Sequence, residues 1–148
     1  MNVKESVKKY QAQAELEELL PRMQRVFKQI KDMEDEWSNH YDRNDPEEQY
    51  RRGMFYKAGD LMDDAARVLT QVFEDVRVEG YLKQQSNGRY ELNGTELFSG
   101  SGIEFLSVDH DPPRWVATHI EHYDGDYRLV NYREVPLNGL HVRIKRTC

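Results

Sequence analysis

The 148-residue sequence predicts an α+β protein in which an N-terminal antiparallel α-helical hairpin precedes a small antiparallel β-barrel-like module. Three observations predict this class. Apolar residues recur at steps of three and four through the first half of the chain. Short alternating segments between turn residues fill the second half. The change between the two patterns falls near Val76, so we place the helical hairpin at residues 1–78 and the β module at residues 79–148.

An apolar stripe between Ala14 and Trp37 predicts the first helix. Its members are Leu16, Leu19, Leu20, Met23, Val26, Phe27, Ile30, Met33 and Trp37. The subset that runs from Met23 has strict heptad spacing, which suits packing against a second helix. Pro21 lacks a backbone N–H and disfavours helix at the residue before it. We therefore expect either one kinked helix or a short helix followed by a longer one.

The second helix is predicted to begin near Asp45 and to end near Asp75. Asp45 can cap the helix, Pro46 suits its first turn, and the glutamates that follow favour the positive end of the helix dipole. Its apolar face contains Tyr50, Met54, Ala58, Leu61, Ala65, Val68, Leu69 and Val72. Two such helices joined by a short polar link form an antiparallel hairpin. The apolar stripe is expected to be a seam within one chain or between two, which leaves open a homodimer through the hairpin.

Five or six short strands are predicted in the second half. Asn93-Gly94 and Asp124-Gly125 are typical two-residue hairpin turns. The expected strand segments are 89–92, 95–98, 103–108, 114–122, 127–132 and 140–144, and the segment 76–82 before them alternates weakly. Short strands at this spacing are typical of a small barrel or a strongly curved sheet.

The same region resembles a family of bacterial domains of unknown function. The resemblance is carried by the segments 88–92, 98–104, 115–122, 127–130 and 137–144, and it covers about sixty residues. It implies a small β domain of Gram-positive bacteria, their phages and mobile elements, and it leaves the helical hairpin unaccounted for. It carries no activity, but small acidic proteins from that setting are often inhibitors of host defence that work by binding.

Charge is unevenly distributed. The chain has a net charge of −6; residues 1–80 contain 13 Lys/Arg against 18 Asp/Glu, and residues 81–148 contain 8 against 9. An acidic surface repels nucleic-acid phosphates and anionic membranes. A protein partner with a basic or nucleic-acid-binding surface is therefore favoured over direct nucleic-acid binding. The longest apolar runs are only a few residues, so we expect neither a signal peptide nor a membrane span, and a cytoplasmic protein.

The hairpin contains the candidate partner-binding surface, which is acidic. Its residues are Asp35, Glu36, Asp42, Asp45, Glu47 and Glu48. Paired carboxylates serve acid–base chemistry only when burial separates their pKa values, and these lie in charged stretches. The sequence therefore predicts a non-enzymatic binding protein. We expect an acidic inhibitor or modulator of a nucleic-acid-handling protein, for example an anti-CRISPR protein of a phage or mobile element.

An alternative function uses the β module as a small nucleotide- or nucleic-acid-binding unit. Aromatic and arginine side chains can stack on bases. The candidates are Arg89, Trp115, Tyr127, Arg128 and Arg143. Because strand alternation spreads them over two faces, part of this set is expected to fill the core.

No catalytic, cofactor or metal site is predicted. His119 and Glu121 share one face of a strand, but zinc sites need three or four converging ligands, and only residues 109–111 offer another. Ser99 and Ser101 lack the strand-to-helix context of a nucleophile. Cys148 is the only cysteine, which excludes an intramolecular disulfide and a thiolate cluster.

Overall fold

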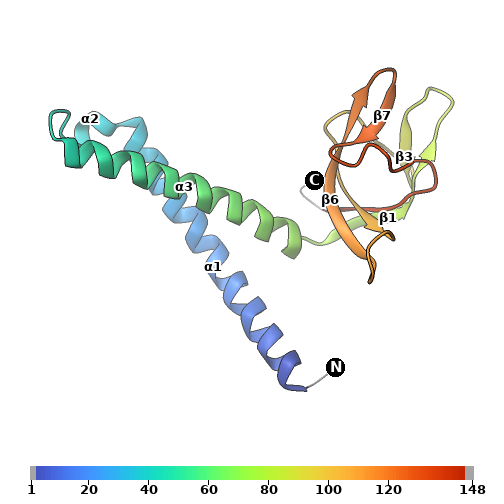
Figure 1. Cartoon of the computed structure of the whole chain (residues 1–148), viewed down its shortest axis with the longest axis horizontal. Coiled ribbons are helices and arrows are strands. Elements are labelled where there is room, and N and C mark those ends of the chain that lie inside the picture. The colour runs from blue at the N-terminus through green and yellow to red at the C-terminus, as the bar shows by residue number, and fades with distance from the viewer. Residues whose placement is uncertain (1–2, 146–148) are drawn as a thin grey trace. The chain divides into compact units, whose positions relative to one another are not determined.

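The computed structural model describes residues 3–145 and confirms the α+β class. The chain divides into two compact units, a helical unit that ends at Phe73 and a β unit that begins at Glu74. The boundary expected after residue 78 lies inside the first strand, β1 (Val76–Tyr81), so only two residues separate the last helix from the sheet. Figure 1 shows helices in the first unit and strands in the second.

The helical unit contains α1 (Val3–Asp35), the short α2 (Trp37–His40) and α3 (Pro46–Phe73). α1 begins before the apolar stripe and includes Pro21 without ending there. α3 begins where the capping residues predict, because the Asp45 side chain accepts a hydrogen bond from the Glu47 N–H at 2.9 Å. Among the described residues, no helix has both the length and the apolar character needed to cross a bilayer.

α1 and α3 run in opposite directions where they touch. Glu34 in α1 pairs with Arg52 in α3, and Ile30 in α1 lies against Gly59 in α3, where a Cβ would come within 3.2 Å of the Ile30 side chain. Gly59 and Ala66 are the buried residues of α3. The N-terminal half of α1 extends beyond its crossing with α3 (Figure 1), and Leu19 in this half is 43% exposed. A hairpin packed along its whole length is therefore not confirmed.

The predicted apolar face of α3 does not pack against α1. Leu61 is 62% exposed and Val68 is 67% exposed, and Leu61 lies about 200° of helix rotation from Gly59. Six exposed residues form this outward row, which we call the outer stripe: Met54, Ala58, Leu61, Ala65, Val68 and Val72. The buried small residues Gly59 and Ala66 thus lie at the intrachain seam, and the outer stripe lies on the opposite side of α3.

The β unit contains two antiparallel sheets. The larger has the order β1-β8-β5-β6-β7, and the smaller has the order β2-β3-β4. After β1, the strands are β2 (Lys83–Gln84), β3 (Tyr90–Leu92), β4 (Thr95–Glu96), β5 (Gly102–Ser107), β6 (Arg114–Tyr123), β7 (Asp126–Leu129) and β8 (His141–Lys145). The larger sheet is open, with β1 and β7 at its edges, so a barrel is not confirmed.

Local turn chemistry sets the hairpins of this unit. Asn93 and Gly94 have φ values of 47° and 87°, and Asp124 and Gly125 have φ values of 52° and 80°. Successive positive φ angles are what a type I′ turn requires, and Asn-Gly and Asp-Gly adopt them at low cost. Both predicted hairpin turns are confirmed.

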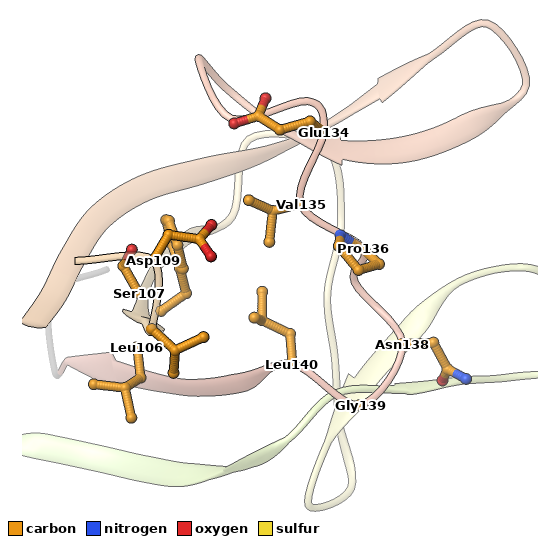
Figure 2. A pocket seen from close by; sticks show the side chains of 11 residues that line it. Leu106, Ser107, Asp109, Glu134, Val135, Pro136, Asn138, Gly139 and Leu140 are labelled. Carbon is orange, nitrogen blue, oxygen red and sulfur yellow. The ribbon is translucent and has the colours of Figure 1, made fainter. Parts of the chain in front are cut away.

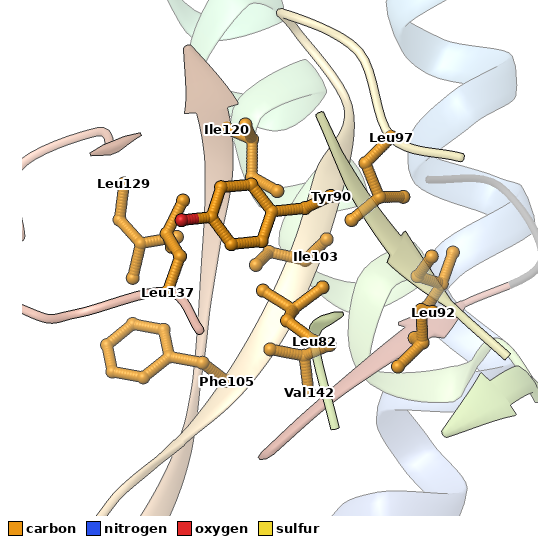
Figure 3. Packing of buried hydrophobic residues seen from close by; sticks show 11 residues of the cluster. Leu82, Tyr90, Leu92, Leu97, Ile103, Phe105, Ile120, Leu129, Leu137 and Val142 are labelled. Carbon is orange, nitrogen blue, oxygen red and sulfur yellow. The ribbon is translucent and has the colours of Figure 1, made fainter. Parts of the chain in front are cut away.

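The hydrophobic core lies entirely within the β unit. Figure 3 shows side chains from both sheets converging on it. In β8, Val142 and Ile144 point into this core, whereas Arg143 pairs on the other face. The cluster comprises Leu82, Tyr90, Leu92, Leu97, Ile103, Phe105, Ile120, Leu129, Leu137, Val142 and Ile144. Each large apolar side chain buried in this way contributes roughly 1.5–3 kcal/mol to the free energy of folding, so this cluster is the main source of stability for the β unit.

Candidate functional site

Net negative charge is concentrated around the link between α1 and α3. Residues 32–52, which we call the acidic end, contain eight Asp/Glu against three Arg, a net charge of −5. All six predicted acidic candidates lie here. Asp35 ends α1, Glu36 precedes α2, Asp42 and Asp45 lie in the link, and Glu47 and Glu48 form the first turn of α3. Four of the six are exposed, and Asp45 and Glu48 are half-buried.

Three of these carboxylates hold the link in place. Asp42 accepts a hydrogen bond from the Asn44 N–H at 2.9 Å, and Asp45 accepts the one from Glu47. The Glu47 carboxylate pairs with Arg51 at 3.2 Å. Asp35, Glu36 and Glu48 take no part in these bonds. Asp35 and Glu36 are exposed, Glu48 is half-buried, and the Glu36 carboxylate lies 3.8 Å from His40 Nε2.

The side chain of Arg52 joins the start of α3 to the end of α1. Arg52 donates two hydrogen bonds to Glu34, at 2.9 and 2.6 Å, and its guanidinium lies 3.9 Å from the centre of the Trp37 ring. Arg43 lies over the same ring at 5.1 Å. The hydrogen bonds from Arg52 lower the pKa of Glu34 below its ordinary value and raise the pKa of Arg52. The result is a rigid scaffold that presents the remaining carboxylates.

The fold separates the five residues that were predicted to form the alternative, nucleotide-binding site. Trp115 and Arg143 are brought together, with the guanidinium 4.3 Å from the ring centre. The ring centre of His141 lies 5.0 Å from that of Trp115, and the ring centre of Tyr81 lies 4.8 Å from that of His141. These four side chains, which we call the aromatic row, extend across the outer face of the larger sheet. Arg143 also donates a 2.6 Å hydrogen bond to the buried Glu104 carboxylate. The positive guanidinium thereby compensates the negative charge of Glu104.

The other predicted stacking residues lie elsewhere. Tyr127 packs on the core, edge-on to Tyr90 at 6.5 Å. Arg128 is paired in register with Glu121 on β6.

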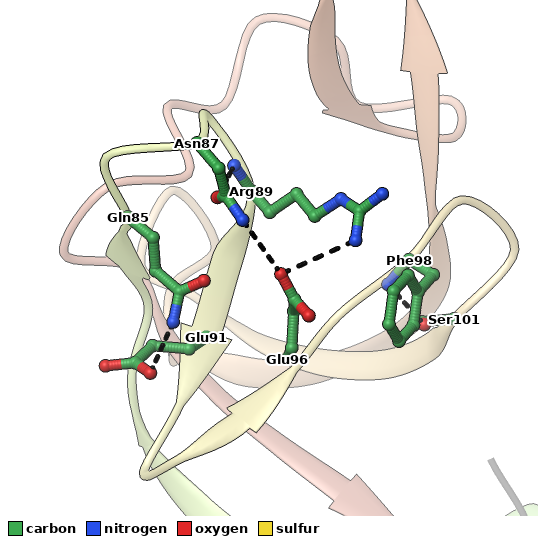
Figure 4. Close-up of polar contacts among 7 residues, drawn as sticks. All are labelled: Gln85, Asn87, Arg89, Glu91, Glu96, Phe98 and Ser101. Carbon is green, nitrogen blue, oxygen red and sulfur yellow. Dashed lines mark hydrogen bonds and ion pairs between the residues drawn. The ribbon is translucent and has the colours of Figure 1, made fainter.

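Arg89 lies in the smaller sheet, where Figure 4 shows it directed at Glu96. The two charged groups are 3.7 Å apart, and Asn87 also donates to Glu96 at 3.2 Å. The guanidinium lies 5.2 Å from the Phe98 ring. The five candidates therefore do not form one surface, because Arg89 serves a local polar network.

A hollow of about 320 Å³ lies between the end of β5 and the segment before β8. Figure 2 shows Leu106, Val135 and Leu140 directed into it, with Asp109 and Glu134 nearby. Sequence reasoning missed this hollow because its two lining segments are far apart in the chain and share no motif. An apolar lining with two carboxylates suits an aliphatic group that carries a positive charge.

The side chains of Ser107 and His110 are joined by a hydrogen bond. Ser107 Oγ lies 2.8 Å from His110 Nδ1, and Ser107 is 7% exposed. The two residues are three positions apart at the end of β5. The contact therefore fastens the loop that follows this strand.

Potential metal ligands do not converge in the described part of the chain. Within residues 3–145, no three His, Cys, Asp or Glu side chains lie close enough together to hold an ion. His119 and Glu121 lie on β6, and Glu121 is 3.6 Å from Arg133. Cys148 lies outside the described residues.

Comparison with known proteins recognises only the β unit. By its fold, this unit is a small domain made of an open five-stranded antiparallel sheet and a three-stranded sheet. A family model described as a domain of unknown function (DUF5348) matches residues 80–144, which supports the expected C-terminal domain of unknown function. The comparisons found no match among curated proteins and none among solved structures.

Proposed function

We propose that the protein is a non-enzymatic binding protein whose acidic end occupies a basic surface of a nucleic-acid-handling protein. The observation that supports this proposal is the charge of −5 within residues 32–52, against −6 for the whole chain. Concentrated charge of one sign steers a partner of opposite sign and accelerates association. Carboxylates held on a rigid helical scaffold compete with phosphates for the same arginine and lysine side chains.

The setting that we propose is a phage or mobile element, in which such a protein acts in the cytoplasm as an inhibitor of host defence. An anti-CRISPR protein is the example with the most direct assay. A guide-RNA-loaded nuclease has a positively charged channel for nucleic acid. An acidic protein that fills part of such a channel prevents the target DNA from binding.

The test measures binding of target DNA by a panel of guide-RNA-loaded nucleases, with and without the purified protein. The informative variant reverses Asp35, Glu36 and Glu48 to Lys, because the hydrogen bonds that hold the link are accepted by Asp42 and Asp45 instead. Its matched control reverses Glu15, Glu17 and Glu18 in the first half of α1, which changes the net charge by the same amount. We expect inhibition to fall at least about tenfold with the first variant, to persist with the control, and to weaken as salt rises.

The same samples test the second candidate function. The aromatic row favours stacking on a base or nucleotide, because Tyr81 is 65% exposed at its end. Under that function, the protein itself shifts a labelled oligonucleotide, and Trp115→Ala removes the shift. Oligonucleotide binding that is undiminished by the Asp35, Glu36 and Glu48 reversals would contradict the acidic-inhibitor proposal.

A further inference from the structure

The outer stripe of α3 is an exposed apolar row with the spacing of a coiled-coil seam. Its six members follow one another at steps of four, three, four, three and four, which is the spacing of core positions in a heptad repeat. All six are exposed, and the large ones range from 46% at Met54 to 67% at Val68. A single exposed apolar residue is ordinary, but a contiguous row marks an interaction surface.

We propose that a second copy of this chain covers the outer stripe, with the two α3 helices side by side and antiparallel. From Met54 to Ala65 the stripe alternates large and small side chains, which makes this part complementary to itself. In one antiparallel register, Leu61 of each copy faces Ala58 of the other, and Met54 of each faces Ala65 of the other. Leu61 and Met54 then each meet an alanine, which permits close helix packing.

Charge selects this register. The residues that flank the stripe on one side include Lys57 and Asp64, both exposed. In the proposed register, Lys57 of each copy lies opposite Asp64 of the other, so that the two-fold symmetry creates two ion pairs. A slip of one heptad towards the C-terminus would instead place the two Asp64 carboxylates opposite each other.

Charge also favours the antiparallel over the parallel orientation of the two α3 helices. The acidic end carries a net charge of −5 at the start of α3. Parallel helices would bring two such ends together, and like charges in contact disfavour association. Antiparallel helices place them at opposite ends of a contact in which α3, with 28 residues, is about 42 Å long.

Sedimentation equilibrium of the full chain tests the dimer. We expect a reversible dimer at roughly 100 µM, a concentration about a hundredfold above a dissociation constant of 1 µM. Leu61→Gln should raise the dissociation constant at least about tenfold, since it places an amide in the seam. Its matched control is Asp60→Gln, one residue away and outside the stripe, which should leave the dissociation constant within about twofold.

The register is tested by charge exchange. Lys57→Asp and Asp64→Lys should each weaken the dimer several-fold, and the double variant should restore it, because the pairs reform with reversed sign. This rescue remains informative even if Leu61→Gln loses helix content, since both exchanged positions are exposed.

The direction is tested by cross-linking in a Cys148→Ser background. A mixture of Ala58→Cys and Leu61→Cys chains should form a disulfide-linked dimer, whereas Ala58→Cys alone should not. A wild-type chain that is monomeric at this concentration would overturn the proposal. So would equal effects of Leu61→Gln and Asp60→Gln, failure of the double charge exchange to restore the dimer, or efficient cross-linking of Ala58→Cys with itself.

Discussion

At the scale of single residues, the pair between Glu34 and Arg52 joins the two long helices. Hydrogen bonds from Arg52 hold the pKa of Glu34 below its ordinary value. A lowered folded pKa stabilises the fold at every pH above the unfolded pKa, which is about 4.3 for glutamate. That contribution is lost as the pH falls through the folded value.

We therefore expect the thermal stability of the helices in the wild type to fall more steeply below about pH 4 than in Glu34→Gln. The variant should be less stable than the wild type at pH 7, and the difference should shrink towards pH 3. Circular dichroism at several pH values measures both curves. A constant difference between the wild type and Glu34→Gln across this range would show that the pair does not contribute in this way.

Residue-level chemistry was predictable wherever the signal is local. Asp45 as a cap and Asn93-Gly94 as a turn depend only on their neighbours in sequence, so both were predicted. The aromatic row was only partly predictable, because Trp115 and Arg143 come from strands β6 and β8, with β5 between them. Tyr81 and His141 were not among the candidates, since their contact follows from the pairing of β1 with β8.

At the scale of elements, α3 contains two glycines in different surroundings. A Cβ on Gly53 would meet nothing within 4 Å, whereas a Cβ on Gly59 would meet the Ile30 side chain at 3.2 Å. Glycine inside a helix costs about 1 kcal/mol relative to alanine. Gly53→Ala should therefore stabilise the helical unit by roughly 0.5–1 kcal/mol.

The matched variant is Gly59→Ala, in which the same gain in helix propensity is opposed by crowding against Ile30. We expect Gly59→Ala to stabilise less than Gly53→Ala when both are measured by denaturant unfolding. An equal gain at both positions would mean that the helices separate freely at Gly59.

The helix assignments were predictable from periodicity, but the face that each helix buries was not. Apolar periodicity identifies a stripe without identifying what covers it. In α3 the covered side holds Gly59 and Ala66, whose small side chains allow close approach to α1 and contribute little to an apolar pattern. The prediction therefore assigned the contact to the larger residues of the outer stripe.

At the scale of the whole molecule, burial differs sharply between the two units. Within the described residues, the large buried apolar side chains belong to the β unit, whereas the buried apolar side chain of the helices is Ala66. A fragment of residues 74–148 should therefore unfold cooperatively on its own, with a midpoint independent of its concentration.

The corresponding experiment on the full chain follows the helical signal. If a second copy covers the outer stripe, the helical midpoint should rise with protein concentration, because association stabilises the folded state by mass action. The midpoint of the β unit should stay constant. A fragment of residues 74–148 that shows no cooperative transition would contradict the independence of the β unit.

Each unit contains one of the chain's two tryptophans, and both lie beneath an arginine that is paired with a glutamate. Trp37 lies under Arg52, and Trp115 lies under Arg143. The protein thus carries one tryptophan per unit, each in contact with a cation whose departure changes its emission. With excitation at the red edge, where tyrosine does not absorb, replacing Trp115 by Phe leaves tryptophan fluorescence from the helices alone, and replacing Trp37 leaves it from the sheet. The two units can therefore be followed separately without any added dye.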